Sequence, residues 1–85
     1  MILVFDSYAW IEYFAGSEKG LKVKDLMLKA DLIYTPSVIL LEIANKYFRE
    51  KFDVSVVNER LKIIRRISIV DPIRDDVLVI LKDAQ

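Results

Sequence analysis

An unbroken apolar run that ends in an aspartate opens the chain and limits the folds it can adopt. Ile2–Phe5 contains no polar residue, which is typical of a strand buried on both faces of a parallel sheet. Asp6 follows at the carboxyl end of this strand, where ligands bind in open α/β sheets. Two more short strands are predicted, Leu32–Thr35 and Ile67–Val70, with helical segments between them. This alternation predicts an α/β fold of three layers with a short parallel sheet.

Five helices are predicted around the three strands, and the chain provides stop and start signals for them. Asp6 or Ser7 can cap the first helix, Ser17 can cap the second, and Pro36 suits the first turn of the third. The predicted helices are Tyr8–Phe14, Glu18–Lys29, Pro36–Lys51, Ser55–Arg66 and Asp75–Ala84. Helical spacing predicts that seven side chains of the second and third helices face a core: Leu21, Leu26, Met27, Leu40, Ile43, Ala44 and Tyr47.

The length and the apolar content together predict one small domain that meets another chain. The sequence has 85 residues, and 54% of them are hydrophobic, whereas about 45–50% is usual. A small domain with this excess is expected to be an oligomer or to bind a partner. No window approaches the roughly 20 apolar residues of a membrane span, and Met1–Phe5 is too short for a signal peptide. We therefore expect a cytoplasmic protein without a membrane contact.

The charged and metal-ligating residues exclude several classes of chemistry. Thirteen basic residues balance thirteen acidic ones, so bulk electrostatics do not indicate a nucleic-acid binder. The chain has no histidine and no cysteine, which removes the commonest general base and the thiolate chemistry. Carboxylates, hydroxyls and amides remain, and these ligands favour Mg²⁺ or Mn²⁺.

Two carboxylates stand out as candidates for such a site. Asp6 lies at a strand end, and Glu42 lies within the apolar run Val38–Ile43, where a carboxylate is expected to cost free energy unless it has a partner. The alternative for Asp6 is a simple helix cap. The alternative for Glu42 is a side chain that extends into solvent. A hard-cation site formed by both residues is the functional hypothesis.

Three segments carry a resemblance to a known family. Ile2–Ile11 resembles the opening of the PIN-domain nucleases, particularly VapC-type toxins, with an apolar strand, an aspartate, a small hydroxyl residue and an apolar helix. Thr35–Ile43 is similar to the second motif, where strand two leads into a helix with the second acid. Val70-Asp71-Pro72 matches the third strand and its exit. The resemblance covers essentially the whole chain.

The resemblance implies a metal-dependent endoribonuclease that a cognate antitoxin holds inactive. In this family, three or four acidic residues gather around Mg²⁺ or Mn²⁺. Carried over by position, Asp6 would be a direct ligand, and Glu42 would be a ligand or would position a water molecule. Ser7 and Ser37 would support the ligands or contact the RNA backbone.

The resemblance also implies that part of the family pattern is missing. The family's remaining acids follow the helix that begins near Asp75, so residues 1–85 are expected to form a single truncated PIN-like domain with weak or no activity alone. The family strand order is 3-2-1-4-5. Without the last two strands, Ile2–Phe5 would be an exposed edge, and such edges invite association. The sequence therefore predicts a homodimer that pairs through the side of strand one.

Other functions remain open at this point. One is a non-catalytic interaction module that self-associates or binds an antitoxin. A phospho-acceptor receiver domain with Asp71 is disfavoured, because that fold needs a second acid after strand one and a lysine after strand five. A group of basic residues is expected to form an ordinary solvated face, with phosphate contact as the alternative: Arg60, Lys62, Arg65 and Arg66.

Overall fold

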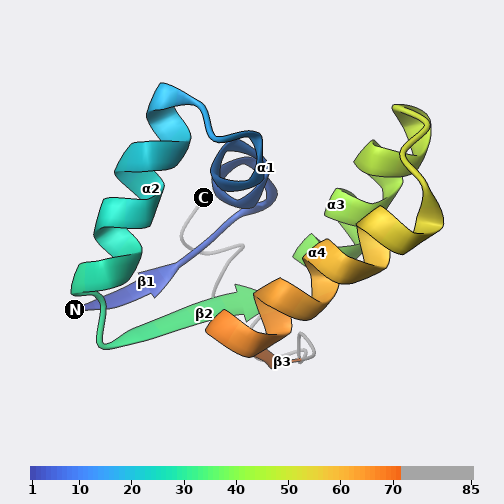
Figure 1. Ribbon diagram of the computed structural model, residues 1–85. Coiled ribbons are helices and arrows are strands. Elements are labelled where there is room, and N and C mark those ends of the chain that lie inside the picture. The colour runs from blue at the N-terminus through green and yellow to red at the C-terminus, as the bar shows by residue number, and fades with distance from the viewer. Residues whose placement is uncertain (72–85) are drawn as a thin grey trace, which may run out of the picture.

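The computed structural model describes residues 1–71, which form three strands and four helices (Figure 1). The predicted α/β class with a three-stranded parallel sheet is confirmed. The predicted helix Asp75–Ala84 lies outside the described residues. In chain order the elements are β1 (Ile2–Val4), α1 (Ser7–Ala15), α2 (Glu18–Lys29), β2 (Leu32–Pro36), α3 (Ser37–Arg49), α4 (Val54–Ile67) and β3 (Ile69–Asp71).

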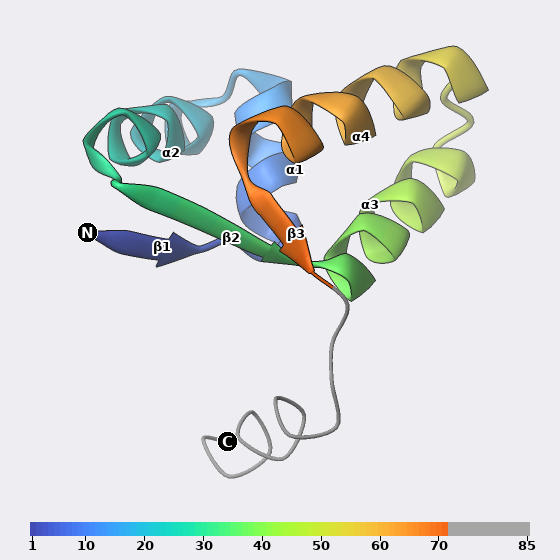
Figure 2. The ribbon, with the colours of Figure 1, turned by 90° about the horizontal axis from the view of Figure 1, so that it is seen from below.

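The described sheet has the strand order β1-β2-β3, and both strand pairs are parallel. Ile2 lies opposite Leu32, and Tyr34 lies opposite Ile69. The four described helices lie on one side of this sheet (Figure 2). On its other side the strands expose apolar side chains, with Ile2 69% and Val4 66% exposed. Because β1 is the first strand in the order β1-β2-β3, it is an edge strand of the described sheet. The homodimer through this edge stays a prediction.

The core lies between the sheet and the helices. It contains eight buried hydrophobic side chains: Phe5, Trp10, Ile33, Leu40, Ile43, Tyr47, Val57 and Ile64. The predicted inward face of α3 is confirmed, but the prediction for α2 is partly wrong, because Leu21 and Leu26 are exposed. α2 contacts α1 through Gly20, where a Cβ would collide with the carbonyl group of Glu12. This close contact turns both leucines toward solvent.

Buried hydroxyl groups connect three elements of the core. The indole N–H of Trp10 donates to Thr35 Oγ1 at 3.1 Å, and the Thr35 hydroxyl donates to Ser68 Oγ at 3.0 Å. The Ser68 hydroxyl donates in turn to the carbonyl oxygen of Ile64 at 2.7 Å. The polar side-chain groups of Trp10, Thr35 and Ser68 therefore all have partners, as burial requires. These linked hydrogen bonds join α1, β2 and the carboxyl end of α4.

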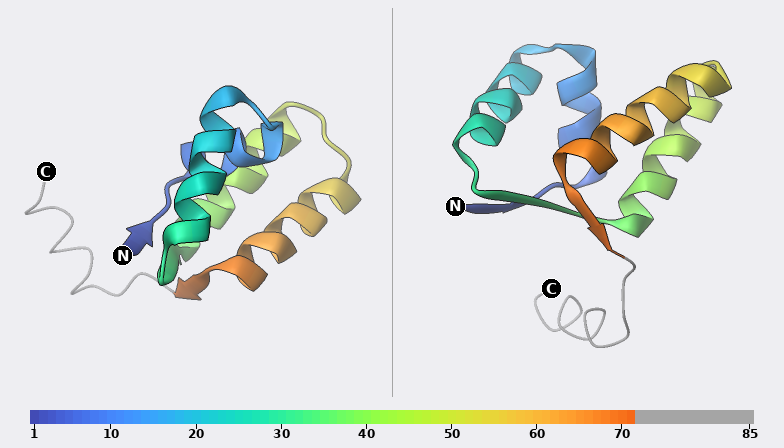
Figure 3. Two further views of the ribbon diagram at one scale, coloured as in Figure 1. Left: turned by 60° about the vertical axis from the view of Figure 1, so that its left-hand side comes forward. Right: turned by 60° about the horizontal axis from the view of Figure 1, so that its bottom comes forward.

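The connection between β2 and α3 differs slightly from the prediction. Pro36 ends β2 and occupies the cap position of α3, so the helix begins at Ser37. Proline suits this place, because a residue before the first helical turn needs no N–H donor. After α3, Lys51 adopts a left-handed conformation with φ of 64°, and the chain reverses into α4. The two helices lie side by side, and they extend beyond the carboxyl end of β2 (Figure 3).

Arg60 of α4 packs over aromatic rings instead of belonging to a solvated basic face. Its guanidinium carbon lies 4.8 Å from the ring centre of Tyr47, 5.0 Å from Phe52 and 5.4 Å from Phe14. The planar guanidinium group is attracted to the ring faces and joins α1, α3 and α4. Arg65 and Arg66 are exposed at the last turn of α4, where positive charge complements the helix dipole. Within residues 1–71, no helix is long and apolar enough to cross a membrane.

Candidate active site

The carboxyl edge of the sheet brings the starts of α1 and α3 to one side of the molecule. Asp6 follows β1 directly, and it caps α1 with an extended backbone, at φ −90° and ψ 179°. Its Oδ1 accepts a hydrogen bond from the backbone N–H of Ala9 at 2.9 Å. The other carboxylate oxygen makes no hydrogen bond with the residues that the structure describes. Asp6 can therefore cap the helix and still present one oxygen to a ligand.

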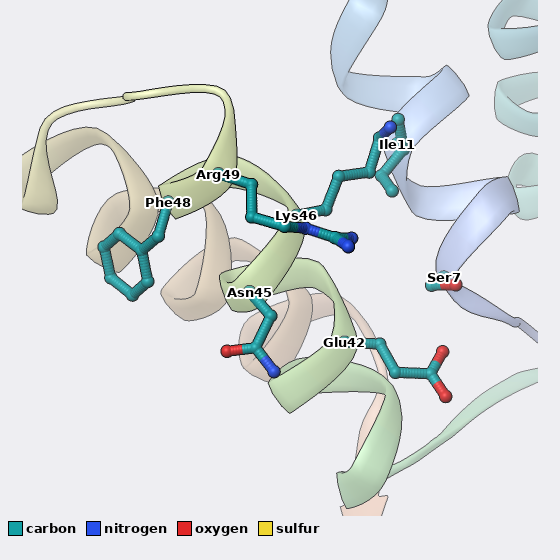
Figure 4. A pocket seen from close by; sticks show the side chains of 7 residues that line it. All are labelled: Ser7, Ile11, Glu42, Asn45, Lys46, Phe48 and Arg49. Carbon is teal, nitrogen blue, oxygen red and sulfur yellow. The ribbon is translucent and has the colours of Figure 1, made fainter.

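An open pocket of about 730 Å³ lies between α1 and α3. Ser7 at the start of α1 and Glu42 on α3 face each other across it (Figure 4). The sequence predicted four site residues, and two of them, Ser7 and Glu42, line this pocket. Asp6 directly precedes Ser7 in the chain. Ser37 begins α3 but does not line the pocket. The pocket is lined by Ser7, Ile11, Glu42, Asn45, Lys46, Phe48 and Arg49.

Glu42 is exposed, and the expectation of a costly buried carboxylate was wrong. The apolar residues of α3 divide between two faces of the helix. Leu40 and Ile43 face the core, whereas Leu41 is 60% exposed on the outer side. Glu42 lies between these faces and turns toward α1 (Figure 4). Its carboxylate forms no hydrogen bond or ion pair within residues 1–71, so both oxygens are available to a ligand.

The basic residues of the pocket wall were not predicted from the sequence. Lys46 and Arg49 extend from α3 toward α1, on the same side as Glu42 (Figure 4). Lys46 Nζ lies 3.0 Å from Glu50 Oε1, whereas Arg49 forms no ion pair among the described residues. The signal was present in the spacing, because residues four and seven positions after Glu42 share its side of the helix. The positively charged side chains of Lys46 and Arg49 can bind phosphate oxygens in the pocket.

The oxygen donors around the pocket fit a hard divalent cation in type. Carboxylates of Asp6 and Glu42, the Ser7 hydroxyl and the Asn45 amide oxygen are ligands of the kind that Mg²⁺ and Mn²⁺ accept. Residues 1–71 contain no group of three or more acidic, histidine or cysteine side chains that could hold a metal ion. If these residues bound a metal ion, water molecules would occupy its remaining coordination positions.

Other acidic and aromatic residues of α1 have structural roles. Glu12 is half-buried and accepts a hydrogen bond from the Ser17 hydroxyl at the turn between α1 and α2, so it is not a freely solvated residue. Trp10 is fully buried, and Tyr13 and Phe14 pack against its indole at 5.8 and 6.0 Å between ring centres. The indole of Trp10 cannot stack on a nucleic-acid base from this position.

The family of the chain follows from a comparison with known domain families. The model of the PIN domain matches residues 3–84, almost the entire chain. The chain therefore belongs to the PIN-domain family, which is a family of nucleases that generally depend on divalent metal ions. No curated protein and no solved structure matches the chain.

Proposed function

We propose that this PIN-domain protein is a VapC-type toxin with the activity of a Mg²⁺- or Mn²⁺-dependent endoribonuclease. One observation carries the proposal: Glu42 and Ser7 face each other across an open pocket at the edge of the sheet where Asp6 ends the first strand (Figure 4). The site combines oxygen donors for a cation with two basic side chains for phosphates. Hydrolysis of a phosphodiester needs both kinds of group.

Each residue has a distinct part in this proposal. Asp6 and Glu42 hold the ion, and Ser7 and Ser37 support them or bind the RNA backbone. When it is bound, the ion lowers the pKa of its water and offsets negative charge on the phosphoryl oxygens. Two further residues orient the RNA: Lys46 and Arg49 bind phosphates that flank the cleaved bond.

The partners in this proposal are RNA, an antitoxin protein and a second copy of the chain, all in the cytoplasm. In this proposal residues 1–85 act as a single PIN-like domain. A second candidate function is a non-catalytic module that self-associates or binds the antitoxin. The exposed apolar side chains of α3 favour this candidate, with Leu41 60% and Phe48 46% exposed.

RNA cleavage in the presence of Mn²⁺ separates the two functions. The substrate is a fluorescent single-stranded RNA, and Asp6→Asn, Glu42→Gln and Glu59→Gln are compared with the parent chain. Asparagine also caps helices, so Asp6→Asn preserves the fold while it removes a charged ligand. Glu59 is exposed on α4, outside the pocket between α1 and α3, and serves as the control.

We expect cleavage that Asp6→Asn and Glu42→Gln reduce at least tenfold and that Glu59→Gln leaves unchanged. Cleavage that survives both site variants would mean that a contaminating nuclease or another site is responsible. If the parent chain shows no cleavage over a range of Mn²⁺ concentrations, the interaction module is the better assignment.

A further inference from the structure

A second pocket lies at the amino edge of the sheet, at the opposite end of the strands from the candidate active site. It has a volume of about 500 Å³ and lies between α2 and α4, which stand on either side of α1 (Figure 2). Its lining includes Leu32 and Ile69, the first residues of β2 and β3. Tyr13 of α1 also lines it. We call this cavity the amino-edge pocket.

The floor of the amino-edge pocket is buried and offers little to a polar ligand. Ile33 is 6% and Ser68 8% exposed at the pocket wall. The proton of the Ser68 hydroxyl is already donated to the carbonyl oxygen of Ile64 at 2.7 Å. Met27 and Ile67 line the pocket as well and are half-buried. An occupant of the deep part has to be apolar, because a polar group there would lose its hydrogen bonds with water.

The mouth of the pocket carries positive charge. Lys24 on α2 and Arg66 in the last turn of α4 both line the pocket and are exposed. Neither forms an ion pair within residues 1–71. The acidic residue of the lining is Asp31, and its carboxylate pairs with the amino group of Met1. An anion at the mouth therefore meets one free cation from each of two helices.

The helix dipoles do not cancel this positive charge. The carboxyl ends of α2 and α4 lead into β2 and β3 at the amino edge, and each end is equivalent to about half a negative charge. Lys29 in the last turn of α2 and Arg65 in the last turn of α4 offset these two ends. The charges of Lys24 and Arg66 therefore remain for an external ligand.

We propose that the amino-edge pocket binds a fatty acid, with the alkyl chain on the buried floor and the carboxylate at the mouth between Lys24 and Arg66. The volume lies within the range of about 300–1,000 Å³ that is usual for ligand pockets. The flexible side chain of Met27 adapts to the shape of an alkyl chain. The guanidinium group of Arg66 matches a carboxylate, which it can bind through two parallel hydrogen bonds.

This proposal goes beyond the nuclease assignment. The candidate active site lies between α1 and α3, and the two pockets share no lining residue. Binding of a fatty acid at the amino edge needs neither RNA nor a metal ion. The two proposals can therefore fail independently of each other.

The competing apolar surface is the open face of the sheet. Ile2 is 69% and Val4 66% exposed there, and neither residue lines the amino-edge pocket. β1 contributes no charged side chain, so adsorption of an alkyl chain to it would not depend on a carboxylate. The two surfaces thus differ in whether the negative charge of the ligand matters.

Methyl NMR spectroscopy with decanoate, kept below the concentration at which it forms micelles, tests the proposed site. Acetate supplies the carboxylate without the chain, and decanol supplies the chain without the charge. We expect decanoate to cause saturable shifts of the methyl groups of Met27, Ile33 and Ile67. Decanol should bind roughly fivefold more weakly, and acetate should not bind. Ile43, which is buried in α3 outside the pocket lining, is the internal reference.

Three results would overturn the proposal. The first is the absence of any saturable shift with decanoate. The second is a set of shifts confined to Ile2 and Val4, which would assign the effect to adsorption on the open face of the sheet. The third is binding of decanol as tight as that of decanoate, which would mean that the cations at the mouth do not select the ligand.

Substitution of the cations tests their part in binding. Arg66→Gln and Lys24→Gln should each raise the dissociation constant of decanoate roughly fivefold. Arg65→Gln is the matched control, because Arg65 is exposed in the same last turn of α4 but does not line the pocket. Thermal unfolding without ligand checks that each variant is folded. If Arg65→Gln weakened binding as much as Arg66→Gln, the attraction would be a diffuse effect of a basic surface, and the proposed site would be wrong.

Discussion

The buried core and the candidate pocket are built in opposite ways, although α1 and α3 contribute to both. In the core, Trp10, Thr35 and Ser68 are each buried, and each has a hydrogen-bond partner. In the pocket, Glu42 and Arg49 are exposed, and neither forms an ion pair within residues 1–71. The same two helices therefore contribute to a core in which these three polar side chains are hydrogen-bonded and to a pocket wall whose charged groups are free to bind a ligand.

The difference shows where this chain can change without losing its fold. A substitution in the core removes packing and leaves polar groups without partners, and both effects destabilise the native state. A substitution on the pocket wall removes only exposed groups, so it should change ligand binding and leave stability almost unchanged. Four predictions test this contrast, beginning with the largest expected effect.

Truncation of Ile43 should be the most destabilising of these changes. Ile43 is fully buried on the inner face of α3, and Ile43→Ala is expected to lower the free energy of unfolding by about 2–5 kcal/mol. Leu28→Ala on α2 should change it by less than about 0.5 kcal/mol, because Leu28 is exposed. Urea denaturation followed by circular dichroism measures both values. Equal losses for the two variants would mean that the division into core and surface is wrong.

The buried hydroxyl chain should give the next largest effect. Thr35→Val keeps the shape of the side chain, but it leaves the Trp10 indole N–H without an acceptor and Ser68 without its donor. A loss of about 1–3 kcal/mol is expected. Thr35→Ser keeps the hydroxyl group and is the control, with a smaller loss from the missing methyl group. The hydrogen bonds would be unimportant if valine proved as stable as threonine or more so.

The sequence predicted the order of elements well, because strong local signals mark each of them. Ser17 caps α2 as expected, and the continuous apolar residues of β1 and β2 identified strands. The buried chain from Trp10 to Ser68 could not be predicted, because its members are separated by 25 and 33 residues and meet only in the folded sheet. Long-range partners of this kind leave no periodic signal.

The candidate site was predicted in part, for a related physical reason. Asp6 was identified from its place after a strand, and the cap that it forms is a local interaction. The exposure of Glu42 depended on which face of α3 meets the core, and that helix has apolar residues on two faces. Sequence periodicity could not separate the core face of α3 from its exposed outer face, and so Glu42 was expected among buried residues.

Asp6 allows a smaller test, in which stability and ligand binding can be separated. Asp6→Ala removes the hydrogen bond to the N–H of Ala9 and should cost about 0.5–2 kcal/mol of stability. Asp6→Asn should cost only a few tenths of a kcal/mol, because asparagine caps helices about as well. Thermal unfolding of both variants without metal measures the difference. If Asp6→Asn destabilises as much as Asp6→Ala, the negative charge itself supports the fold at the start of α1.

The smallest effect concerns an exposed pair that joins α1 to α2. Lys19 Nζ lies 3.0 Å from the hydroxyl oxygen of Tyr8, and this hydrogen bond raises the pKa of Lys19 above its ordinary value of 10.5. A raised lysine pKa stabilises the native state at every pH below the unfolded value, and the contribution is lost as the pH rises through the folded value. Stability at neutral pH should therefore include this contribution, and stability above pH 10.5 should progressively lack it.

Tyr8→Phe tests this assignment because it removes the hydroxyl group and keeps the ring. The pKa of Lys19, measured by NMR titration of its side chain, should fall back toward 10.5. The stability difference between the variant and the parent chain should be small and should vanish at high pH, since solvent screens an exposed pair. An unchanged Lys19 pKa in Tyr8→Phe would mean that the hydroxyl group does not hold the ammonium. Such a surface contact would then contribute nothing to the packing of α2 on α1, which includes the close contact at Gly20 and the hydrogen bond from Ser17 to Glu12.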